Sequence, residues 1–563
     1  MSQAGSPVWT TGTTEVYHAG TWRSQIPKYI NPPSPCHSAC PVDGNIALWI
    51  QQIKERDYYG AWVTLTENNP YPGIAGRICH HPCEPACNRG HYDEPIAICG
   101  LERFVGDLAL EQGWKFPAVP ISMQERIAVI GGGPAGLAAA FHLRRRGYAV
   151  SIFEARPQLG GLLRYGIPPY RLSNDVLDRE TRRILDLGIE VHTNTPVRSR
   201  EDFEKIKNTF DVLYLAMGAD TPKRLPILDY DQDYVMDGAR YLELTNSGTV
   251  PDLGQRIVVI GGGSAAMDAA RTARRHGKDI TILALEARDN MPCQREEVEE
   301  AEQEAIRIIN GAMLKSVEQS VTGLQLNCIK VDFIPGEQRG RFTLQEKSGT
   351  EFIIEADHIV TSIGQHPDMS VLGNLVQSNG ALIQVDGQYR TTAEGIFAGG
   401  DVASMERFVT VAFGMGKEAA GYIHRFLHPE IHEHGNVGIN RYITIHKVDN
   451  PPGADRDVDV RVINKYYYDK LPRENQGMVS AAERLKNFNE TQLNFSVDRA
   501  LQESMRCFSC GNCTFCDNCM YYCPDMAITR IDHGYAVSSD FCKGCGLCVN
   551  ECPTGSIAMF GDS

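Results

Sequence analysis

Two stretches of the chain share one pattern of apolar and polar positions. Residues 126–154 read as an apolar strand, a glycine turn, an amphipathic helix and a second strand followed by an acid, and residues 256–283 repeat the strand, turn, helix and strand. This order predicts the βαβ unit of a parallel, doubly wound sheet. Two shorter apolar runs next to glycines, at 213–219 and 359–364, are typical of core strands at the crossovers between two such domains.

The first unit carries glycines at the three positions that a dinucleotide site needs. Gly131 permits the tight turn, Gly133 lets the backbone approach a pyrophosphate, and Gly136 allows the helix to pack closely. Glu154 follows the second strand, where a ribose hydroxyl needs an acceptor. Because strand, helix and distal acid are in register, the pattern favours a dinucleotide site over an incidental glycine-rich turn.

The second unit places Gly261, Gly263 and Ala266 at the corresponding positions, and alanine is an accepted variant at the third. Two dinucleotide sites indicate either two soluble cofactors or one bound flavin and one exchangeable nicotinamide. A later strand ends at Gly400 and Asp401, an arrangement typical of flavoproteins whose aspartate accepts from a ribityl hydroxyl. Alone it would read as a solvated turn, but downstream of both units it predicts FAD in the first fold and NADH or NADPH in the second.

All but two of the eighteen cysteines cluster near the two ends of the chain, which favours metal ligation over disulfides. The exceptions, Cys293 and Cys328, are expected to be packing residues. The spacing CxxCxxCxxxCP occurs twice in the C-terminal region and is typical of a two-cluster ferredoxin, in which the fourth cysteine of each run binds the other cluster. The duplication and the prolines count against structural zinc sites or a disulfide scaffold. The pattern predicts one [4Fe-4S] cluster on Cys513, Cys516, Cys519 and Cys552, and a second on Cys523, Cys542, Cys545 and Cys548.

The length and the net charge of the chain limit the classes of protein to which it can belong. A chain of 563 residues with 42% apolar content is long enough for three or four domains with their own cores. A net charge of −15 argues against nucleic-acid or anionic-membrane partners. Neither an apolar leader at residues 1–25 nor a run of eighteen apolar residues is found, so a cytoplasmic protein is expected.

Several longer strings resemble a known family. GGLLRYGIPPYRL at residues 160–172, the cysteine segments PCHSACP and GRICHHPCEPAC, and SMRCFSCGNCTFCDNC in the tail are similar to the small-subunit family of NADPH-dependent glutamate synthase. That family also includes the flavin and iron-sulfur halves of dihydropyrimidine dehydrogenase and of bifurcating transhydrogenase. The resemblance covers about residues 36–427 and implies FAD in the first fold and a nicotinamide in the second. Within its first string, Gly161 and Arg164 are further cofactor-binding candidates.

The resemblance also implies an iron-sulfur cluster near the flavin, held by three cysteines and a glutamate. The matching residues are Cys40, Cys79, Cys83 and Glu102, although Glu102 also reads as an ordinary acid on a helix surface. A second N-terminal cluster of the family needs a cysteine pair upstream of Cys36, where this chain has no cysteine at 31–35. One cluster is therefore expected in this domain. An atypical site with an outside ligand stays open for Cys36, Cys87 and Cys99, and Cys507 and Cys510 read as spare ligands or buried thiols.

One departure from the family concerns the nicotinamide. NADPH-using relatives place a Tyr-Arg-Arg run after the second strand of this fold, because guanidinium groups bind the 2′-phosphate. This chain has Ala284, Leu285 and Glu286 there. A carboxylate at this position would repel a phosphate and accept a hydrogen bond from a free ribose hydroxyl, which predicts NADH over NADPH. The alternatives are that Arg274 or Arg288 folds back to bind the phosphate, or that Glu286 is an idle loop acid.

These patterns predict a multidomain protein. It has an α-helical iron-sulfur domain, two nested Rossmann-like α/β dinucleotide domains and a C-terminal α+β ferredoxin-like domain. The expected boundaries are 26–115 for the helical domain, 120–239 and 359–427 for the split FAD domain, 240–358 for the NAD(P)H domain, 428–500 for a linker or docking segment, and 501–563 for the ferredoxin domain. The linker is too long for a bare loop and is expected to pin the ferredoxin domain to the rest or to form a partner surface.

The combination predicts an electron-transfer flavoenzyme. NAD(P)H passes hydride to FAD and electrons leave singly through the clusters, or the reverse, and no side-chain acid, base or nucleophile is predicted to be catalytic. No substrate domain is found, so the terminal chemistry is expected in a partner iron-sulfur enzyme or ferredoxin.

Similar flavoproteins with a ferredoxin tail serve dissimilatory sulfite reductase, 2-oxoacid:acceptor oxidoreductases or soluble ferredoxin. The first, in sulfur metabolism, is favoured by analogy, because an NADH-type site would suit drawing electrons from sulfur oxidation. A glutamate synthase small subunit is the second enzyme candidate, and a noncatalytic redox sensor or scaffold is the alternative from another class. Whether the chain forms a homodimer stays open.

Overall fold

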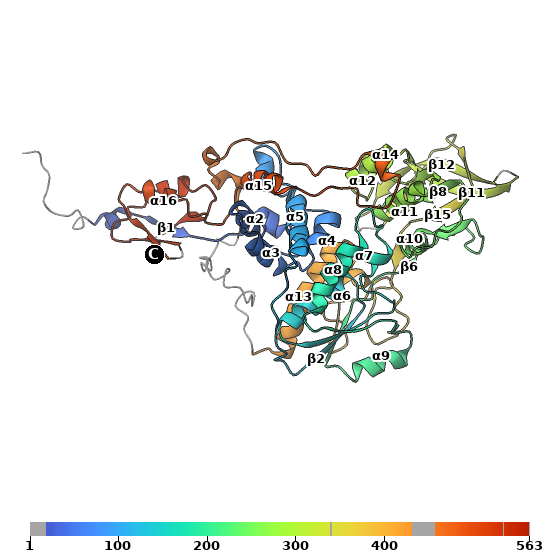
Figure 1. Cartoon of the computed structure of the whole chain (residues 1–563), viewed down its shortest axis with the longest axis horizontal. Helices are drawn as coiled ribbons and strands as arrows, with labels where there is room; N and C mark the ends of the chain where they lie inside the picture. Colours follow the sequence, from blue (N-terminus) through green and yellow to red (C-terminus); the bar gives the residue numbers. More distant parts are fainter. Residues whose placement is uncertain (1–17, 322, 338–340, 431–455, 533, 562–563) are drawn as a thin grey trace, which may run out of the picture.

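The computed structural model describes residues 18–430 and 456–561, apart from residues 322, 338–340 and 533. The chain forms an elongated molecule (Figure 1). The C-terminal module lies at one end, the helical domain in the middle with the first dinucleotide domain beneath it, and the second dinucleotide domain at the other end.

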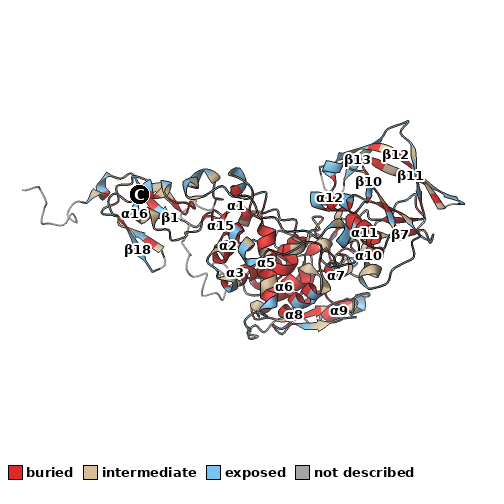
Figure 2. Ribbon diagram, turned by 45° about the horizontal axis from the view of Figure 1, so that its top comes forward, coloured by how far each residue is buried: buried red, intermediate tan, exposed pale blue. Residues whose placement is uncertain are grey.

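The first dinucleotide domain has a five-stranded parallel sheet in the order β17-β5-β2-β3-β4. The apolar side chains of β2 and β5 are buried, as expected for a parallel sheet covered on both faces. Helix α13 packs along α6 on one face of this sheet, and α6 is almost fully buried (Figure 2). The elements are β2 (Arg126–Ile130), α6 (Pro134–Arg145), β3 (Ala149–Phe153), α7 (Leu162–Tyr165), α8 (Asn174–Leu185), β4 (Glu190–His192), α9 (Arg200–Lys207), β5 (Val212–Leu215), β17 (Ile396–Ala398), η5 (Gly400–Val402) and α13 (Val409–Leu427).

The second dinucleotide domain is inserted between β5 and β17. Its parallel sheet has the order β10-β9-β8-β15-β7, and an antiparallel sheet of β11 to β14 packs at its side. The two-stranded pair of β6 and β16 joins the two crossovers between the domains. The elements are β6 (Thr221–Pro222), β7 (Val235–Asp237), α10 (Gly238–Asn246), β8 (Arg256–Ile260), α11 (Ser264–Arg275), β9 (Asp279–Leu283), η4 (Arg288–Asn290), α12 (Arg295–Gln303), β10 (Arg307–Ile309), β11 (Ala312–Ser320), β12 (Gly323–Pro335), β13 (Phe342–Glu346), β14 (Phe352–Ala356), β15 (His358–Thr361) and β16 (Gln365–His366).

The insertion is a few residues longer than the predicted 240–358. Strand β7 begins at Val235, and β15 continues to Thr361, and both pair within the second sheet. The prediction placed 235–239 and 359–361 in the FAD domain because short buried strands carry no periodic signal of their own.

The helical domain packs short helices around a core that contains Trp49 and Trp62. Helices α4 and α5 cross so closely that a side chain on Gly76 or Gly106 would collide with the facing backbone. The elements are α1 (Pro35–Ser38), α2 (Ile46–Lys54), α3 (Tyr58–Thr66), α4 (Pro72–Ile78), η3 (Asn88–His91) and α5 (Ile98–Glu111).

The C-terminal module contains a strand from the other end of the chain. Strand β1 (Gln25–Tyr29) pairs antiparallel with the last strand, β20 (Ile557–Gly561), with Tyr29 opposite Ile557. The prediction that residues 26–29 belong to the helical domain is therefore corrected. The remaining elements are η2 (Ala19–Trp22), α16 (Asn518–Tyr521), β18 (Ile528–Ile531), β19 (Gly534–Val537) and α17 (Leu547–Asn550).

Residues 456–496, which we call the strap, run from the C-terminal module past the helical domain to the second dinucleotide domain and return (Figure 1). The strap contains η7 (Val460–Val462), η8 (Lys465–Tyr467) and α14 (Ala481–Arg484), and leads into α15 (Val497–Met505). On the outward run, Arg473 pairs with Glu84 of the helical domain. At the turn, Arg484 donates to Gln303 of α12 (2.6 Å). On the return, Glu490 pairs with Arg77 (2.8 Å) and Arg103 (2.7 Å). The earlier part of the predicted linker, 431–455, lies outside the described residues.

Candidate redox site

The first glycine turn is built for a close backbone approach. Gly131 has φ +107°, and a side chain there would collide with the Ala216 carbonyl. A Cβ on Gly161, whose φ is +53°, would lie 2.9 Å from the Cα of Gly133. A Cβ on Gly136 would overlap the Gly131 carbonyl oxygen. The loop can therefore expose its backbone N–H groups at the start of α6, as a pyrophosphate requires.

Glu154 lies against the same turn. Its carboxylate accepts hydrogen bonds from the backbone N–H groups of Gly132 (2.8 Å) and Arg156 (2.8 Å), and the residue is 7% exposed. A carboxylate has about four acceptor positions, so both oxygens keep capacity for ribose hydroxyls. This arrangement fits the adenosine end of a dinucleotide.

The turn at Gly400 and Asp401 closes the first site from the other side. Gly400 has φ +76°, and a Cβ there would lie 2.9 Å from the Cβ of Ala135, in the first turn of α6. Asp401 is thereby placed near the glycine turn, although it lies about 270 residues away in sequence. The chain's polar groups here fit FAD.

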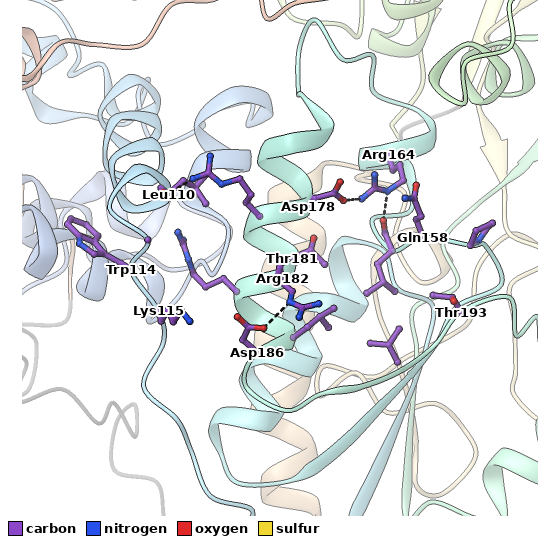
Figure 3. A pocket seen from close by; sticks show the side chains of 17 residues that line it. Leu110, Trp114, Lys115, Gln158, Arg164, Asp178, Thr181, Arg182, Asp186 and Thr193 are labelled. Carbon is purple, nitrogen blue, oxygen red and sulfur yellow. Dashed lines mark hydrogen bonds and ion pairs between the residues drawn. The ribbon is translucent and has the colours of Figure 1, made fainter.

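A cavity of about 830 Å³ opens next to this site, between α8, the end of α5 and the loop after Glu154 (Figure 3). No cysteine lines it, so it is separate from the cluster sites. Arg164 borders it, donating from Nε to the Leu159 carbonyl (2.8 Å) and pairing with Asp178. In the structure Arg164 thus holds the loop that leads to Gly161.

The second glycine turn repeats the geometry of the first. Gly261 has φ +143°, Gly263 precedes α11, and Ala266 is fully buried, its Cβ 3.5 Å from where a Cβ on Gly261 would lie. A Cβ on Gly262 would lie 2.6 Å from a carboxylate oxygen of Glu286. Glu286 therefore occupies the place that Glu154 holds in the first fold, and burial raises the pKa of its carboxyl.

The two arginines that were alternatives for binding a phosphate have other partners. Arg274 donates to the backbone carbonyls of Glu304 (3.0 Å) and Lys278 (3.1 Å), at the far end of α11. Arg288 pairs with Glu302 (2.6 Å) on the surface. Surface pairs of this kind contribute only about 0–1 kcal/mol, so the pair holds Arg288 weakly, whereas Arg274 is held by backbone geometry.

The string at residues 160–172 contacts the second dinucleotide domain and joins it to the first. Arg171 pairs with Asp268 on α11 (2.8 Å) and Glu297 on α12 (2.7 Å). The ring of Tyr170 packs against the Arg275 guanidinium, 3.8 Å from the ring centroid. Sequence reasoning noted this string but missed that it joins the two domains, because its partners lie about a hundred residues away.

The four N-terminal ligand candidates border one cavity. Cys40, Cys79, Cys83 and Glu102 all line it, together with Cys99 and Thr410. Asn69 donates to Glu102 (2.7 Å), and the Cys79 thiol donates to Thr410 (3.4 Å), at the start of α13. Glu102 therefore faces the cysteines and is not a surface acid.

Burial favours the protonated forms of the acidic groups in this cavity when no metal is bound. Burial raises the pKa of the Glu102 carboxyl to about 8 and that of the Cys79 thiol to about 12. Iron would lower these pKa values, because metal binding deprotonates thiols and stabilises carboxylates. The donor set of three thiolates and one carboxylate fits an iron-sulfur cluster.

This cavity adjoins both dinucleotide domains. Lys417 of α13 donates to the carbonyl of Val42 (2.8 Å), beside Cys40, and α13 packs directly on α6. Gln294, at the start of α12, donates to the Cys79 carbonyl (3.4 Å). A cluster in the cavity would therefore lie close to the first dinucleotide fold and touch the second.

In the tail the cysteines form two groups as the spacing predicts. Cys513, Cys516, Cys519 and Cys552 line one pocket, together with Tyr29 of β1. Tyr29 donates its hydroxyl to the Cys519 sulfur (3.2 Å), a contact that sequence spacing could not reveal.

The other group contains Cys523, Cys542, Cys545 and Cys548. Burial is the main cause that raises the pKa of the Cys542 and Cys548 thiols. The neighbouring cysteines add to it, Cys523 and Cys545 at Cys542, and Cys542 and Cys545 at Cys548. Within the described part of the chain, no three His, Cys, Asp or Glu side chains converge as they would on a single metal ion. A cubane instead spreads its thiolates over four irons, so wider groups of this kind suit it.

Comparisons with known proteins agree with this geometry. A family described as pyridine nucleotide-disulphide oxidoreductase matches residues 125–416, which is more than half of the chain. The chain belongs to this family. A dihydropyrimidine dehydrogenase domain II with a 4Fe-4S cluster matches residues 31–114 of the flavoprotein, and a 4Fe-4S binding domain matches residues 535–558.

Several relatives of the flavoprotein are named as subunits of larger enzymes. It is 31% identical over 513 residues to NADP(+)-dependent formate dehydrogenase subunit beta of Moorella thermoacetica, covering 85% of this chain and 70% of that one. It is 29% identical to the small chain of glutamate synthase [NADPH] of Escherichia coli, covering 73% and 93%. With subunit PreT of the NAD-dependent dihydropyrimidine dehydrogenase of the same species it shares 31% identity, covering 70% and 91%.

The predicted resemblance, fold class, enzyme class and cofactor set are therefore confirmed. The flavoprotein is an FAD- and iron-sulfur-dependent oxidoreductase that uses NAD(P)H, with [4Fe-4S] clusters in its N-terminal and C-terminal regions. Among the described residues, the structure contains no helix of the length and apolar character needed to span a bilayer.

Proposed function

We propose that the flavoprotein is an NADH-preferring electron-transfer subunit that exchanges electrons with a partner iron-sulfur enzyme through its C-terminal module. Bound FAD couples a two-electron hydride to one-electron carriers. The chain's own residues position the carriers. The first glycine turn, Glu154 and Asp401 hold FAD, and the second turn holds the nicotinamide. The N-terminal cavity holds the cluster next to the flavin fold, and the two tail groups hold the clusters at the exit.

The preference for NADH rests on one observation, the carboxylate of Glu286 beside Gly262. A 2′-phosphate at this position would meet a negative charge, whereas a ribose hydroxyl would donate to it. Arg274 is bonded away from the site, and Leu285 offers no charge to a phosphate.

The test is the variant Leu285→Arg/Glu286→Arg. We expect the unaltered protein to prefer NADH in kcat/KM, measured by dye reduction, and the variant to shift the NADH:NADPH ratio at least tenfold toward NADPH, about 1.4 kcal/mol. Glu318→Arg, which makes the same substitution as Glu286→Arg but on the exposed part of β11, serves as the control and keeps the ratio. An unaltered ratio in the double variant would refute this role of Glu286.

The partner is proposed from the relatives, which are named as subunits of formate dehydrogenase and glutamate synthase. Among iron-sulfur enzymes, dissimilatory sulfite reductase stays our first candidate, with 2-oxoacid oxidoreductases and glutamate synthase as alternatives. The relatives support an iron-sulfur enzyme as partner, and the choice of sulfite reductase rests on the analogy that an NADH-type site would suit drawing electrons from sulfur oxidation. Anoxic mixing of the NADH-reduced flavoprotein with each enzyme tests it, and the candidate whose clusters are not reduced is discarded.

A further inference from the structure

Four cysteines without a place in the three predicted clusters lie together at the junction of the helical domain and the tail. Cys36 and Cys87 come from the helical domain, and Cys507 and Cys510 follow α15. Cys36 belongs to the helical core, and Cys87 and Cys507 pack against that core. Cys510 is 8% exposed and packs beside Phe508 and Val458. All four are free thiols.

Hydrogen bonds fasten the tail segment beside Cys87. Arg89 donates to the Arg506 carbonyl (2.8 Å), and Ser509 donates to Gln51 of α2 (2.9 Å). Asn88 donates to the Val458 carbonyl (2.8 Å) and lies 3.5 Å from the Cys510 sulfur. Helix α15 packs on α2 and α5. The tail segment is therefore packed as part of the helical domain.

The same segment passes directly over the stretch that lacks cysteines. Gly511 has φ +78°, and a side chain there would collide with the carbonyl of Pro32. The Val458 N–H donates to the Pro33 carbonyl (3.0 Å), which holds this stretch from the strap side. Residues 31–35, just upstream of Cys36, provide no thiol. The Cys507-x-x-Cys510 pair lies next to this stretch.

The four thiols lie near one another, and three of them meet hydrogen-bond donors. The Ser509 N–H points at the Cys507 sulfur (3.4 Å), and the Ser34 hydroxyl lies 3.2 Å from the Cys36 sulfur. Burial chiefly, followed by Cys87, raises the pKa of both Cys36 and Cys507, to about 11 in Cys507. Buried thiols that carry donors and share one volume match the surroundings of a cluster, whose sulfurs accept such bonds.

We propose that Cys36, Cys87, Cys507 and Cys510 hold a fourth [4Fe-4S] cluster, with two ligands from the helical domain and two from the tail. The expectation of a single N-terminal cluster followed from the gap upstream of Cys36, and the tail fills that gap from more than 400 residues away. Cys99 is not part of the group, since its sulfur lies 3.4 Å from the Gly76 carbonyl.

This cluster connects the two ends of the molecule. On one side, Cys36 lies in the same buried core as Cys83, a ligand candidate of the flavin-side cavity. On the other side, Tyr468 donates to the carbonyls of Phe508 (2.9 Å) and Pro553 (3.3 Å), which adjoin Cys507 and Cys552. Each cluster accepts one electron and passes one on, so the two electrons of a hydride would cross the molecule singly, without making or breaking bonds.

Iron content tests the proposal without reference to activity, nicotinamide preference or partner. The full chain, purified under argon, should contain about sixteen iron atoms and sixteen sulfides per FAD, four for each of four clusters. Cys507→Ser/Cys510→Ser should contain about twelve with unchanged FAD, and Cys293→Ser, a lone cysteine in the second dinucleotide domain, should keep about sixteen.

About twelve irons in the unaltered protein would overturn the proposal, as would an unchanged iron content in the double variant. If the double variant does not fold, which its FAD content reports, the iron count of the unaltered protein decides alone. If the fourth cluster is missing but the tail module carries its two clusters, this proposal fails and the proposed function stands. The failure of this proposal can therefore be distinguished from the failure of the proposed function.

Discussion

The variant Gly136→Ala tests a difference between the two dinucleotide folds, because it adds a single methyl group to the glycine turn of the first. In the first fold a Cβ at this position would overlap the carbonyl oxygen of Gly131, which belongs to the backbone and cannot rotate away. In the second fold the corresponding residue is already alanine, and Ala266 is fully buried there. The same methyl group is therefore forbidden in one turn and native in the other.

The size of the effect follows from overpacking. Forcing a methyl group into a filled backbone contact costs roughly 1–3 kcal/mol. Because α6 is buried on all sides, the glycine turn is the part that can shift, and this turn is the one proposed to bind the pyrophosphate of FAD. If the strain appears in FAD binding, the affinity falls about 5- to 150-fold, since 1.4 kcal/mol is a factor of ten.

The assay is FAD release. Gly136→Ala is purified without added flavin, its FAD content is read from the absorbance after gel filtration, and the Kd is measured by fluorescence during reconstitution. Ala266→Gly is the matched control and should keep full FAD. A Kd for Gly136→Ala within twofold of the unaltered protein would refute the assignment of this turn to FAD.

Two further predictions concern the exit and the strap. Cys548→Ala should keep NADH-to-dye reduction, because the proposed flavin site lies in a separate domain, yet it should lose electron delivery to the partner enzyme. Delivery that persists would show that the tail is not the exit. Glu490→Ala removes a carboxylate from the buried Arg77 and Arg103, which should destabilise the strap by about 3 kcal/mol and increase its hydrogen exchange. Glu483→Ala removes an exposed pair with Lys486 and should leave the exchange of the strap unchanged. Equal exchange in both variants would contradict the role of Glu490.

The parts of the molecule that the sequence predicts are those whose chemistry is local. The glycine turns, the acids after their second strands and the two cysteine runs are set by spacing within about thirty residues, and the fold carries them as expected. Domain class followed from these turns, because a strand, turn and helix in register leave few other folds.

The parts that sequence could not predict depend on distant segments. Cys87 and Cys507 meet only because α15 packs on α2 and α5, and no spacing rule spans that interval. The Cys507-x-x-Cys510 spacing was the one available signal. Arg171 finds its acids only when the second domain folds over the first, and strand β1 contains a proline that weakens any strand prediction.

The pairing of β1 with β20 has a consequence for biosynthesis. Strand β1 lies more than 500 residues before β20, so the sheet beside the tail cysteines cannot form until β20 has left the ribosome. Both dinucleotide folds are translated before β20, so they can fold while β1 still lacks its partner strand.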